Sequence, residues 1–503
     1  PPRVLARHPL MLETIALGAQ QLADPVIWIA LISGSVLGII LGAIPGIGPG
    51  VGIVLLLPIT YTMDPLAGIT LLMGLYAAGW YGGAVPAITI NTPGTAVNVL
   101  TTYDGYPMAK NGEPQRALAL AYSSSFVGGI FAVSVLALAA WPLAALSKYL
   151  TSVDLGMAAL LAMVLVVVAH RGSEFASFAM LGAGLFVSTI GLETAYGSAR
   201  YTFGTTWMMA GVPLISMVLG LFALSQALTL IFSDRQIKDA NTEIDRRLLS
   251  GFIEVFRYPK TLFRSAGLGV GMGVLPGVGE FLAQFFAYTS ARAGSKTPEK
   301  FGKGAPEGII ASETANNAVP PAALVPLLSL GIPGEAFTAL MLTVFIVHGV
   351  DPGPTLFEEN KAFVAGLYMT LFIMNFVIVA LLLVGTKWIA KLATVNDRLL
   401  GVIIMCLVMV GTFSSNYRLS DTMIAICFGV LGFALRRANI PMVPMILGLV
   451  LGPIMERYFR QGIGAAGGDM TIFVTRPVSL IFLLVILALI AMSARNAIQR
   501  VRQ

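Results

Sequence analysis

Long apolar runs separated by short polar segments recur along the whole chain. Clear examples are residues 25–43, 117–146, 212–232, 362–384 and 472–492. Each run approaches the ~20 residues that a helix needs to cross a bilayer, and this length criterion predicts about 12 spans. The ~10-residue alternating segments of a transmembrane β-barrel do not occur in the sequence. The predicted fold class is therefore an all-α polytopic membrane protein in a lipid bilayer.

Composition supports the same class. Of the 503 residues, 56% are hydrophobic and 11% are charged, whereas an ordinary soluble domain has roughly 25% charged residues. The net charge of +6 comes from Lys and Arg residues scattered between the apolar runs, which is typical of cytoplasmic loops and does not indicate binding to nucleic acid. The two cysteines lie in apolar sequence and the three histidines are far apart, so no disulfide framework and no metal site are predicted.

The chain divides into two similar halves at a polar interval, residues 233–264. The sequence GAIPGIG at 42–48 returns as GVLPGVG at 273–279, where Pro45 matches Pro276 at a spacing of 276 − 45 = 231. INTPGTA at 90–96 parallels LGIPGEA at 330–336, and Pro93 matches Pro333 at 333 − 93 = 240. VPLI at 212 parallels VPMI at 443, again at 443 − 212 = 231. Three matches in the same order predict an ancient duplication.

The duplication predicts five parts. These are an N-terminal surface segment, 1–24; a first transmembrane repeat, 25–233; a central cytoplasmic loop, 234–264; a second transmembrane repeat, 265–455; and a terminal helix with a basic tail, 456–503. The basic excess of the central loop and the tail places both on the cytoplasmic side. Secondary transporters commonly carry inverted repeats. Inverted repeats have an odd number of crossings each, so an extra span outside the repeat is expected at 472–492.

Five glycines and two prolines interrupt the apolar sequence at 42–52. Proline removes a backbone donor and glycine permits positive φ, so the helix is expected to break there. In a membrane such a break persists only where it faces protein or a water-filled cavity. A single glycine is better explained by helix packing, as in the GxxxG patterns of Gly42 with Gly46 and Gly269 with Gly273. Pro-Gly breaks at matching places in both halves instead predict re-entrant segments around a transport site.

Polar side chains accompany the predicted breaks. In the first half they are Tyr81, Asn91, Thr92, Thr95, Asn98 and the serines at 123–125, and in the second half Asn316, Asn317 and Ser329. No Lys or Arg lies within these motifs. A bound anion would therefore be held by helix N-termini, amides and hydroxyls.

Three glutamates and one glutamine near the breaks predict a site for a coupling ion. They are Glu280, Gln284, Glu313 and Glu335. The carboxylates would repel an anionic substrate unless they were protonated or paired with a cation, and ionisable groups at membrane depth are usually functional. We therefore expect a coupling Na⁺ or H⁺ and no other cofactor. The alternative for each glutamate is a place at the water interface.

The motifs together resemble a known family. GAIPGIGPGVG, YGGAVPAITINTPGTAVNVL, GVLPGVGEF and PEGIIASETANNAVPPAALVPLLSLGIPGEAFTALM are similar to the large membrane subunit of the tripartite tricarboxylate transporters, a likeness that runs from about Leu12 to near the C-terminus. The resemblance implies a multi-pass secondary transporter of the bacterial inner membrane, with a small four-span membrane subunit and a periplasmic solute-binding protein as partners. It also implies symport of a carboxylate, such as a tricarboxylate, a dicarboxylate or an aromatic acid, driven by an ion gradient without ATP.

The resemblance also implies which residues bind the substrate. Carried onto this chain, the family's signature positions are Pro45, Gly46, Gly48, Asn91, Thr92, Pro93, Gly94, Thr95, Pro276, Gly277, Gly279, Asn316, Asn317, Gly331, Pro333 and Gly334. With Tyr81 and Ser329 they form the expected substrate site. By analogy, the two broken-helix regions move together across the membrane as in an elevator.

Two other classes of protein differ from a transporter in what their sequences require. An enzyme would need a converging acid, base, nucleophile or metal set at membrane depth, and the sequence has neither a GxSxG nor an HExxH motif. The alternative that stays open is an ion or solute channel, because Gly-rich breaks can also build a filter lined by carbonyl groups. Two similar halves with broken helices favour a transporter.

Overall fold

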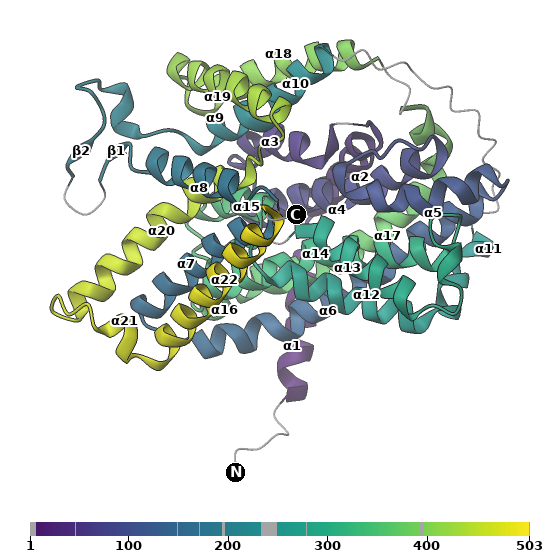
Figure 1. The fold of residues 1–503 in the computed structure, drawn as a ribbon, viewed down its shortest axis with the longest axis horizontal. Helices are drawn as coiled ribbons and strands as arrows, with labels where there is room; N and C mark the ends of the chain where they lie inside the picture. Colours follow the sequence, from purple (N-terminus) through teal and green to yellow (C-terminus); the bar gives the residue numbers. More distant parts are fainter. Residues whose placement is uncertain are drawn as a thin grey trace.

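The computed structural model describes residues 7–45, 47–147, 149–170, 172–193, 197–232, 249–277, 279–392 and 396–501. Within these ranges the chain is almost entirely helical, and its β-structure is one antiparallel hairpin in which Gly191 pairs with Arg200. Figure 1 shows helices from both halves of the chain packed into one body. The predicted all-α class is confirmed.

The first half begins with an N-terminal helix and ends before the central polar interval. Its elements are α1 (Arg7–Gln21), α2 (Pro25–Ala43), α3 (Gly48–Thr60), α4 (Pro65–Thr89), η2 (Ala96–Asn98), α5 (Val99–Lys110), α6 (Pro114–Ser147), α7 (Ser152–Ala169), α8 (Glu174–Ser188), β1 (Gly191–Leu192), β2 (Ala199–Arg200), η3 (Trp207–Ala210), α9 (Leu214–Val218), η4 (Leu219–Leu224) and α10 (Ser225–Ile231).

The longer helices of the second half follow a similar order. Its elements are α11 (Leu249–Phe252), η5 (Glu254–Arg257), α12 (Pro259–Val274), α13 (Gly279–Gly294), η6 (Pro298–Lys300), α14 (Pro306–Leu330), α15 (Ala336–Val347), α16 (Leu356–Glu359), α17 (Lys361–Leu392), α18 (Asp397–Asn416), α19 (Leu419–Arg437), α20 (Val443–Ala465), α21 (Ile472–Thr475) and α22 (Pro477–Val501). Helices α4 and α14 each have 25 residues, and α5 and α15 each have 12. Equal lengths at matching places support the duplication.

Asp-Pro pairs start two of the first-half helices. Asp24 and Asp64 each accept a hydrogen bond from a backbone N–H of the first turn, at 2.8 Å and 2.9 Å, and a proline follows each of them. An acidic cap satisfies a free donor and suits the positive end of the helix dipole, and proline at the first helical position has no donor to lose. The sequence thus fixes where α2 and α4 begin.

Nine helices of the described chain are long and apolar enough to cross a membrane, and three shorter apolar helices, α3, α8 and α15, accompany them. The candidate spans differ in burial. In α4, 94% of the most apolar window is buried, whereas in α22 the share is 11%. Because α14 is buried from Gly308 to Ser329, α4 and α14 form the centre of the molecule and α22 lies at its edge.

The two halves exchange their packing partners. Within the halves, α2 packs on α4 and α12 packs on α14, while α14 also packs on α6 and α4 also packs on α17. The last helix of the second repeat, α20, packs on α7 and α8 of the first half, and α9, η4 and α10 of the first half pack on α18 and α19 (Figure 1). Such reciprocal contacts are typical of two units related by a two-fold axis.

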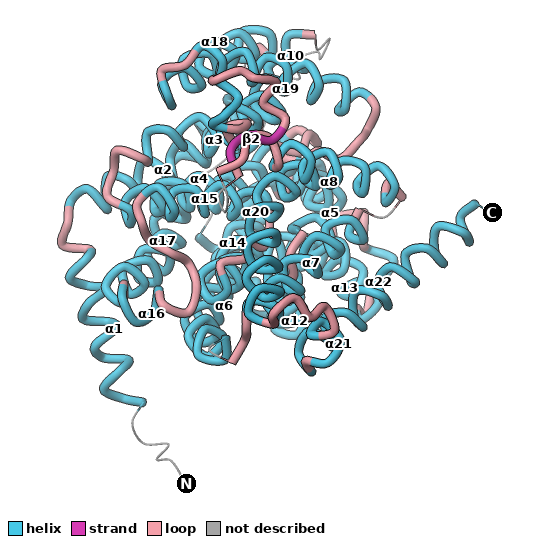
Figure 2. Tube along the Cα trace, turned by 90° about the vertical axis from the view of Figure 1, so that its left-hand side faces the viewer, coloured by secondary structure: helices cyan, strands magenta, loops and turns pink. Residues whose placement is uncertain are grey.

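Element boundaries differ from the predicted parts at two places. Helix α12 begins at Pro259, inside the predicted central loop, and α20 continues through Glu456, where the terminal segment was expected to start. Within the predicted surface segment, α1 packs on α17. The expected extra span lies in α22, which leaves the body of the molecule toward its C-terminal end (Figure 2).

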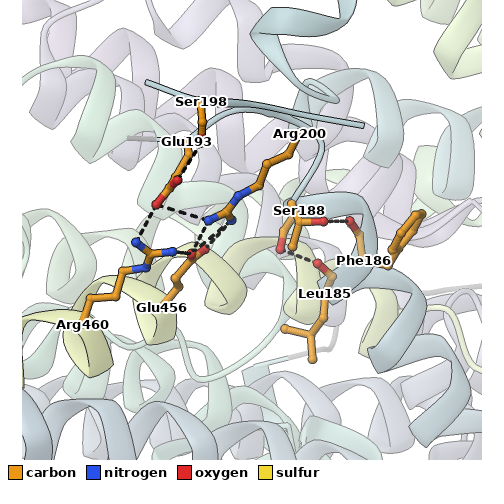
Figure 3. A network of polar contacts seen from close by, with 9 residues as sticks. Leu185, Phe186, Ser188, Glu193, Ser198, Arg200, Glu456 and Arg460 are labelled. Atoms are coloured by element: carbon orange, nitrogen blue, oxygen red, sulfur yellow. Dashed lines mark hydrogen bonds and ion pairs between the residues drawn. The ribbon is translucent and has the colours of Figure 1, made fainter. Parts of the chain in front are cut away.

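An ion network joins the β-hairpin to α20 (Figure 3). Arg200 contacts Glu193 at 3.2 Å and Glu456 at 3.1 Å, and Arg460 contacts the same two carboxylates at 2.5 Å and 2.9 Å. Ser198 also donates a hydrogen bond to Glu193 at 2.9 Å. Because the hairpin belongs to the first half and α20 to the second, the network is a further link between the halves.

Candidate functional site

The helix breaks expected from the Pro-Gly motifs are present at matching places. Helix α2 ends at Ala43 and α3 begins at Gly48, whose φ is +68°, while α12 ends at Val274 and α13 begins at Gly279, whose φ is +70°. A residue with a Cβ is strained in this left-handed region, which explains glycine at both positions. Pro45 lies in the first of these turns. Gly46, which the resemblance places in the site, lies outside the described residues.

A second pair of breaks follows α4 and α14. Three residues after α4 ends, Thr92 donates its N–H to the carbonyl of Pro86 at 3.2 Å, and Ile332 donates to Pro326 at 3.3 Å. Asn91 has φ +54° and Gly331 has φ +70°. Each of these pairs is separated by 240 positions, for example 326 − 86 = 240. The two helices therefore end in the same way, with one residue in the left-handed conformation. Asn tolerates this conformation, and Gly adopts it freely.

The breaks of each half touch one another. Gly94 donates its N–H to Gly83 at 3.2 Å, and a Cβ on Gly94 would lie 2.1 Å from the carbonyl oxygen of Gly42. In the second half Gly277 donates its N–H to Gly334 at 2.7 Å. Within each half, the two Pro-Gly segments are therefore in contact.

A buried polar network lies where α4, α5, α6 and α14 meet. The carboxylate of Glu313 accepts hydrogen bonds from the Thr101 hydroxyl, from Ser125 at 3.0 Å and from the Asn98 amide at 3.3 Å. Asn317 donates to Ser125 at 2.8 Å, and Thr95 donates to Asn98 at 2.5 Å. The first half supplies the hydroxyls and Asn98, and the second half supplies Glu313 and Asn317, so neither half forms this network alone.

Several polar atoms around this network have no protein partner. Both side-chain polar atoms of Asn316, the Oδ1 of Asn317 and the hydroxyl of Ser124 make no hydrogen bond, although all three side chains are at most 3% exposed. A buried polar group without a partner costs about 1–3 kcal/mol. No Lys or Arg is among the buried residues of the described chain. The free donors and acceptors therefore fit a bound ligand, and the charge of Glu313 has no basic partner here.

A second acidic cluster lies at the N-terminal ends of α13 and α15. Glu280 accepts a hydrogen bond from the hydroxyl of Tyr76 on α4, and Glu335 approaches both of these groups. Glu335 also caps α15, because Thr338 shares hydrogen bonds with its backbone at 2.9 Å. The side chains of Tyr76, Trp80 and Phe337 lie against one another around the cluster, with ring centroids 5.0 to 6.0 Å apart.

The remaining predicted residues are spread around the two clusters. Tyr81 is buried but donates its hydroxyl to Asn375 on α17 at 3.0 Å, and Ser329 donates to the carbonyl of Val325 at 2.5 Å. The Asn91 side chain is exposed, Pro93 is half-buried and Pro333 is buried. Gln284 is fully buried with both amide atoms unpartnered. The structure thus brings Thr95, Asn317 and Glu313 into one network, whereas Asn91 is exposed at the end of α4.

Sequence reasoning missed three functional candidates. Thr101 and Tyr76 contact the glutamates, and Asp104 on α5 accepts hydrogen bonds from the backbone N–H groups of Gly302, Gly304 and Ala305 and from the Tyr288 hydroxyl. The three backbone contacts of Asp104 measure 2.8 to 3.0 Å. Asp104 ties α5 to the loop before α14. The available signal for Asp104 was that it is the one acidic residue in the sequence of α5.

Comparison with known proteins identifies the family of this chain. The model of the family described as "Tripartite tricarboxylate transporter TctA family" matches residues 28–447. An uncharacterized 52.8 kDa protein in the TAR-I ttuC′ 3′ region of Agrobacterium vitis is 34% identical over 501 residues, 98% of each chain. An uncharacterized protein in the TAR-II ttuC′ 3′ region of the same organism is 37% identical over 208 residues, 41% of this chain and 86% of the relative. No solved structure matches significantly. The chain belongs to the tripartite tricarboxylate transporter TctA family.

Proposed function

We propose that this chain is the large transmembrane subunit of a secondary, ion-gradient-driven tripartite uptake system for carboxylates in the bacterial inner membrane. A periplasmic binding protein delivers the substrate, and a small four-span membrane subunit completes the transporter. The observation that carries the proposal is the Glu313 network, which needs side chains from both halves. A site shared by two repeats changes its access when one part moves against the other.

The carboxylate group of the substrate binds at the unwound corners. The N-cap residue of α3 is Ile47 and that of η2 is Thr95. Neither helix has a side-chain hydrogen bond that caps its N-terminus. Free N–H groups at a helix start attract an anion. The unpartnered amide atoms of Asn316 and Asn317 add donors of the kind a carboxylate accepts. The substrate site therefore combines Thr95 and the first break with these two amides.

A coupling cation balances the buried acids. Glu313, Glu280 and Glu335 are at most 7% exposed, and no Lys or Arg belongs to the buried core of the described chain. A buried charge without a partner is costly. Na⁺ or H⁺ entering with the substrate removes this cost and links the ion gradient to uptake.

The two repeats are related by inversion and their broken helices move as one elevator-like unit in this proposal. The contacts of Gly94 with Gly42 and of Gly277 with Gly334 support the joint movement, because they make each pair of breaks a single packed unit. The names of the Agrobacterium vitis relatives state no substrate. The substrate is therefore found by screening tricarboxylates, dicarboxylates and aromatic acids.

The test is uptake into membrane vesicles that contain both membrane subunits with the binding protein outside. Labelled citrate, succinate and benzoate are each measured under imposed Na⁺ and pH gradients. We expect saturable uptake of at least one compound that needs a gradient and the binding protein. Glu313→Gln lowers it roughly tenfold or more, because hydrogen bonds to a charged group contribute about 1.5–3 kcal/mol. The exposed Glu299→Gln serves as the control.

Two results would contradict the proposal. Uptake that required ATP and ignored both gradients would exclude a secondary transporter. Flux that rose linearly with concentration, with no counterflow of preloaded substrate, would favour the channel instead.

A further inference from the structure

Asp104 on α5 is fully buried, and both of its carboxylate oxygens bind the second half of the chain. Its Oδ1 accepts hydrogen bonds from the backbone N–H groups of Gly302, Gly304 and Ala305 at 2.8, 3.0 and 2.8 Å. Its Oδ2 accepts a hydrogen bond from the Tyr288 hydroxyl at 2.8 Å. All four donors therefore come from α13 or from the loop between α13 and α14.

The loop before α14 is shaped to hold this carboxylate. Gly302 has φ +82° and Gly304 has φ +104°, a range that residues with a Cβ rarely adopt. Turns of this kind aim successive N–H groups at one point and form a concavity that binds an anion. A Cβ on Gly308 would lie 2.0 Å from the Oδ2 of Asp104. Glycine at this position therefore leaves the space that the carboxylate occupies.

The carboxylate also lies at the start of the central helix α14. The N-cap residue of α14 is Ala305, which makes no side-chain hydrogen bond to the helix. Asp104 from the other half binds the N–H of Ala305, and a negative charge at a helix N-terminus is stabilising. The two halves are thus joined at the beginning of the helix that carries Glu313.

The same part of α5 reaches the Glu313 network. Thr101 lies three residues before Asp104, and residues three apart lie on one face of a helix. The Thr101 hydroxyl donates a hydrogen bond to Glu313 on α14. Because one helix carries both residues, the anchoring of Asp104 at the start of α14 determines where Thr101 lies along α14.

We propose that Asp104 is a positioning residue of the transport site and acts through Thr101. Its four hydrogen bonds fix α5 of the first half on the loop before α14 of the second half, and so they hold the Thr101 hydroxyl on Glu313. This inference rests on the proposed function, which places the transport site at the Glu313 network. A loosened α5 weakens the affinity of that network and leaves the later steps of transport unchanged.

The test is a double-mutant cycle on uptake by proteoliposomes of both membrane subunits with the binding protein outside. Labelled citrate, succinate and benzoate are supplied in turn, and the half-saturating concentration and the maximal rate are measured for the compound that wild-type protein transports. We expect Asp104→Ala and Thr101→Val each to raise the half-saturating concentration roughly tenfold, with a maximal rate close to wild type. The double variant stays within about twofold of the more impaired single variant, whereas independent sites would multiply their effects.

Asp154→Ala is the matched control. Asp154 is also a fully buried acid, and it accepts hydrogen bonds from Thr151, Arg476 and Ser479 on elements outside the Glu313 network. Its loss is expected to leave the half-saturating concentration at the wild-type value. If Asp104→Ala does not fold, Tyr288→Phe removes one of the four hydrogen bonds, keeps the acid and the ring, and carries the same cycle with a smaller increase.

Hydrogen exchange of residues 99–110 in the purified complex gives a readout that needs no transport. Asp104→Ala is expected to accelerate it roughly tenfold or more, and Asp154→Ala is expected to leave it unchanged. Multiplied effects in the double variant, or an unchanged half-saturating concentration in folded Asp104→Ala, would overturn the positioning role while the transporter stands. Wild-type protein that takes up none of the three carboxylates would defeat the proposed function, and unchanged exchange in Asp104→Ala would show that Asp104 does not fix α5.

Discussion

At the scale of single residues, matched glycines in the two halves have different space around them. A Cβ on Gly94 would lie 2.1 Å from the Gly42 oxygen and 2.6 Å from the Gly83 Cα, whereas a Cβ on Gly334 would lie 3.1 Å from its nearest neighbours. Overpacking of a well-packed core costs about 1–3 kcal/mol. We expect Gly94→Ala to lower the stability of the subunit by roughly that amount and Gly334→Ala by less than about 1 kcal/mol. Unfolding of the purified subunit in detergent measures both.

Gly182→Ala is the control for these substitutions, because a Cβ there would meet no atom within 4 Å apart from the adjoining backbone of its own helix, among the described residues. Helical Gly→Ala at such an open site is neutral or slightly stabilising. Equal losses for Gly94→Ala and Gly334→Ala would show that the close contact at Gly94 does not determine stability.

Residue types near the breaks could be predicted from sequence, but their partners could not. An acid or amide in apolar sequence signals function, which led to Glu313 and Asn317. The hydroxyl of Thr101 reaches Glu313 from 212 residues away, and nothing in the spacing of the two residues indicates this contact. Asn91 was assigned to the site for its amide, yet its left-handed φ and exposed side chain indicate a conformational role at the end of α4.

At the scale of elements, the breaks between α2 and α3 and between α12 and α13 followed from the Pro-Gly motifs. That α14 is a continuous helix could not be predicted, because its sequence contains Pro320, Pro321 and Pro326. Neighbouring helices in a membrane can satisfy the backbone groups that proline frees, and α14 is packed by α6, α12 and α13. The polar residues expected beside a break therefore lie in the middle of a continuous helix.

One buried acid links α22 to α7. Asp154 is fully buried and contacts Arg476 at 2.9 Å and Ser479 at 2.5 Å, just before and within α22. Hydrogen bonds to charged groups contribute about 1.5–3 kcal/mol. We expect Arg476→Ala to weaken the docking of α22 by about this amount, and hydrogen exchange of residues 477–495 to become roughly tenfold faster or more. Mass spectrometry of the exchanged peptides measures it.

Arg418→Ala is a suitable comparison, since Arg418 is an exposed residue before α19, far in sequence from α22. Its exchange pattern at 477–495 is expected to match the wild type. Unchanged protection in Arg476→Ala would mean that apolar contacts of α22 with α7, and not the Asp154 cluster, hold the terminal helix.

At the scale of the whole molecule, the duplication was visible in sequence and agrees with the order of elements. The packing of α20 on the first half, and of the segment from α9 to α10 on the second half, could not be predicted from the sequence. Three short motifs give the order of segments but not which surfaces meet. Whether the repeats are inverted is a matter of membrane sidedness. In an inverted pair, equivalent loops face opposite sides of the membrane, and in a parallel pair they face the same side.

Asn111 and Asp351 test this arrangement, because both are exposed and their separation is the repeat spacing, 351 − 111 = 240. With Cys406 and Cys427 replaced by Ser, Asn111→Cys and Asp351→Cys are labelled by a membrane-impermeant maleimide in right-side-out and inside-out vesicles. Inverted repeats expose the two cysteines in opposite preparations, and detergent makes both reactive. Labelling of both cysteines from one side would establish parallel repeats. Parallel repeats with an even number of crossings also return the chain to the cytoplasm. An extra span in α22 would then not be needed to explain a cytoplasmic C-terminus.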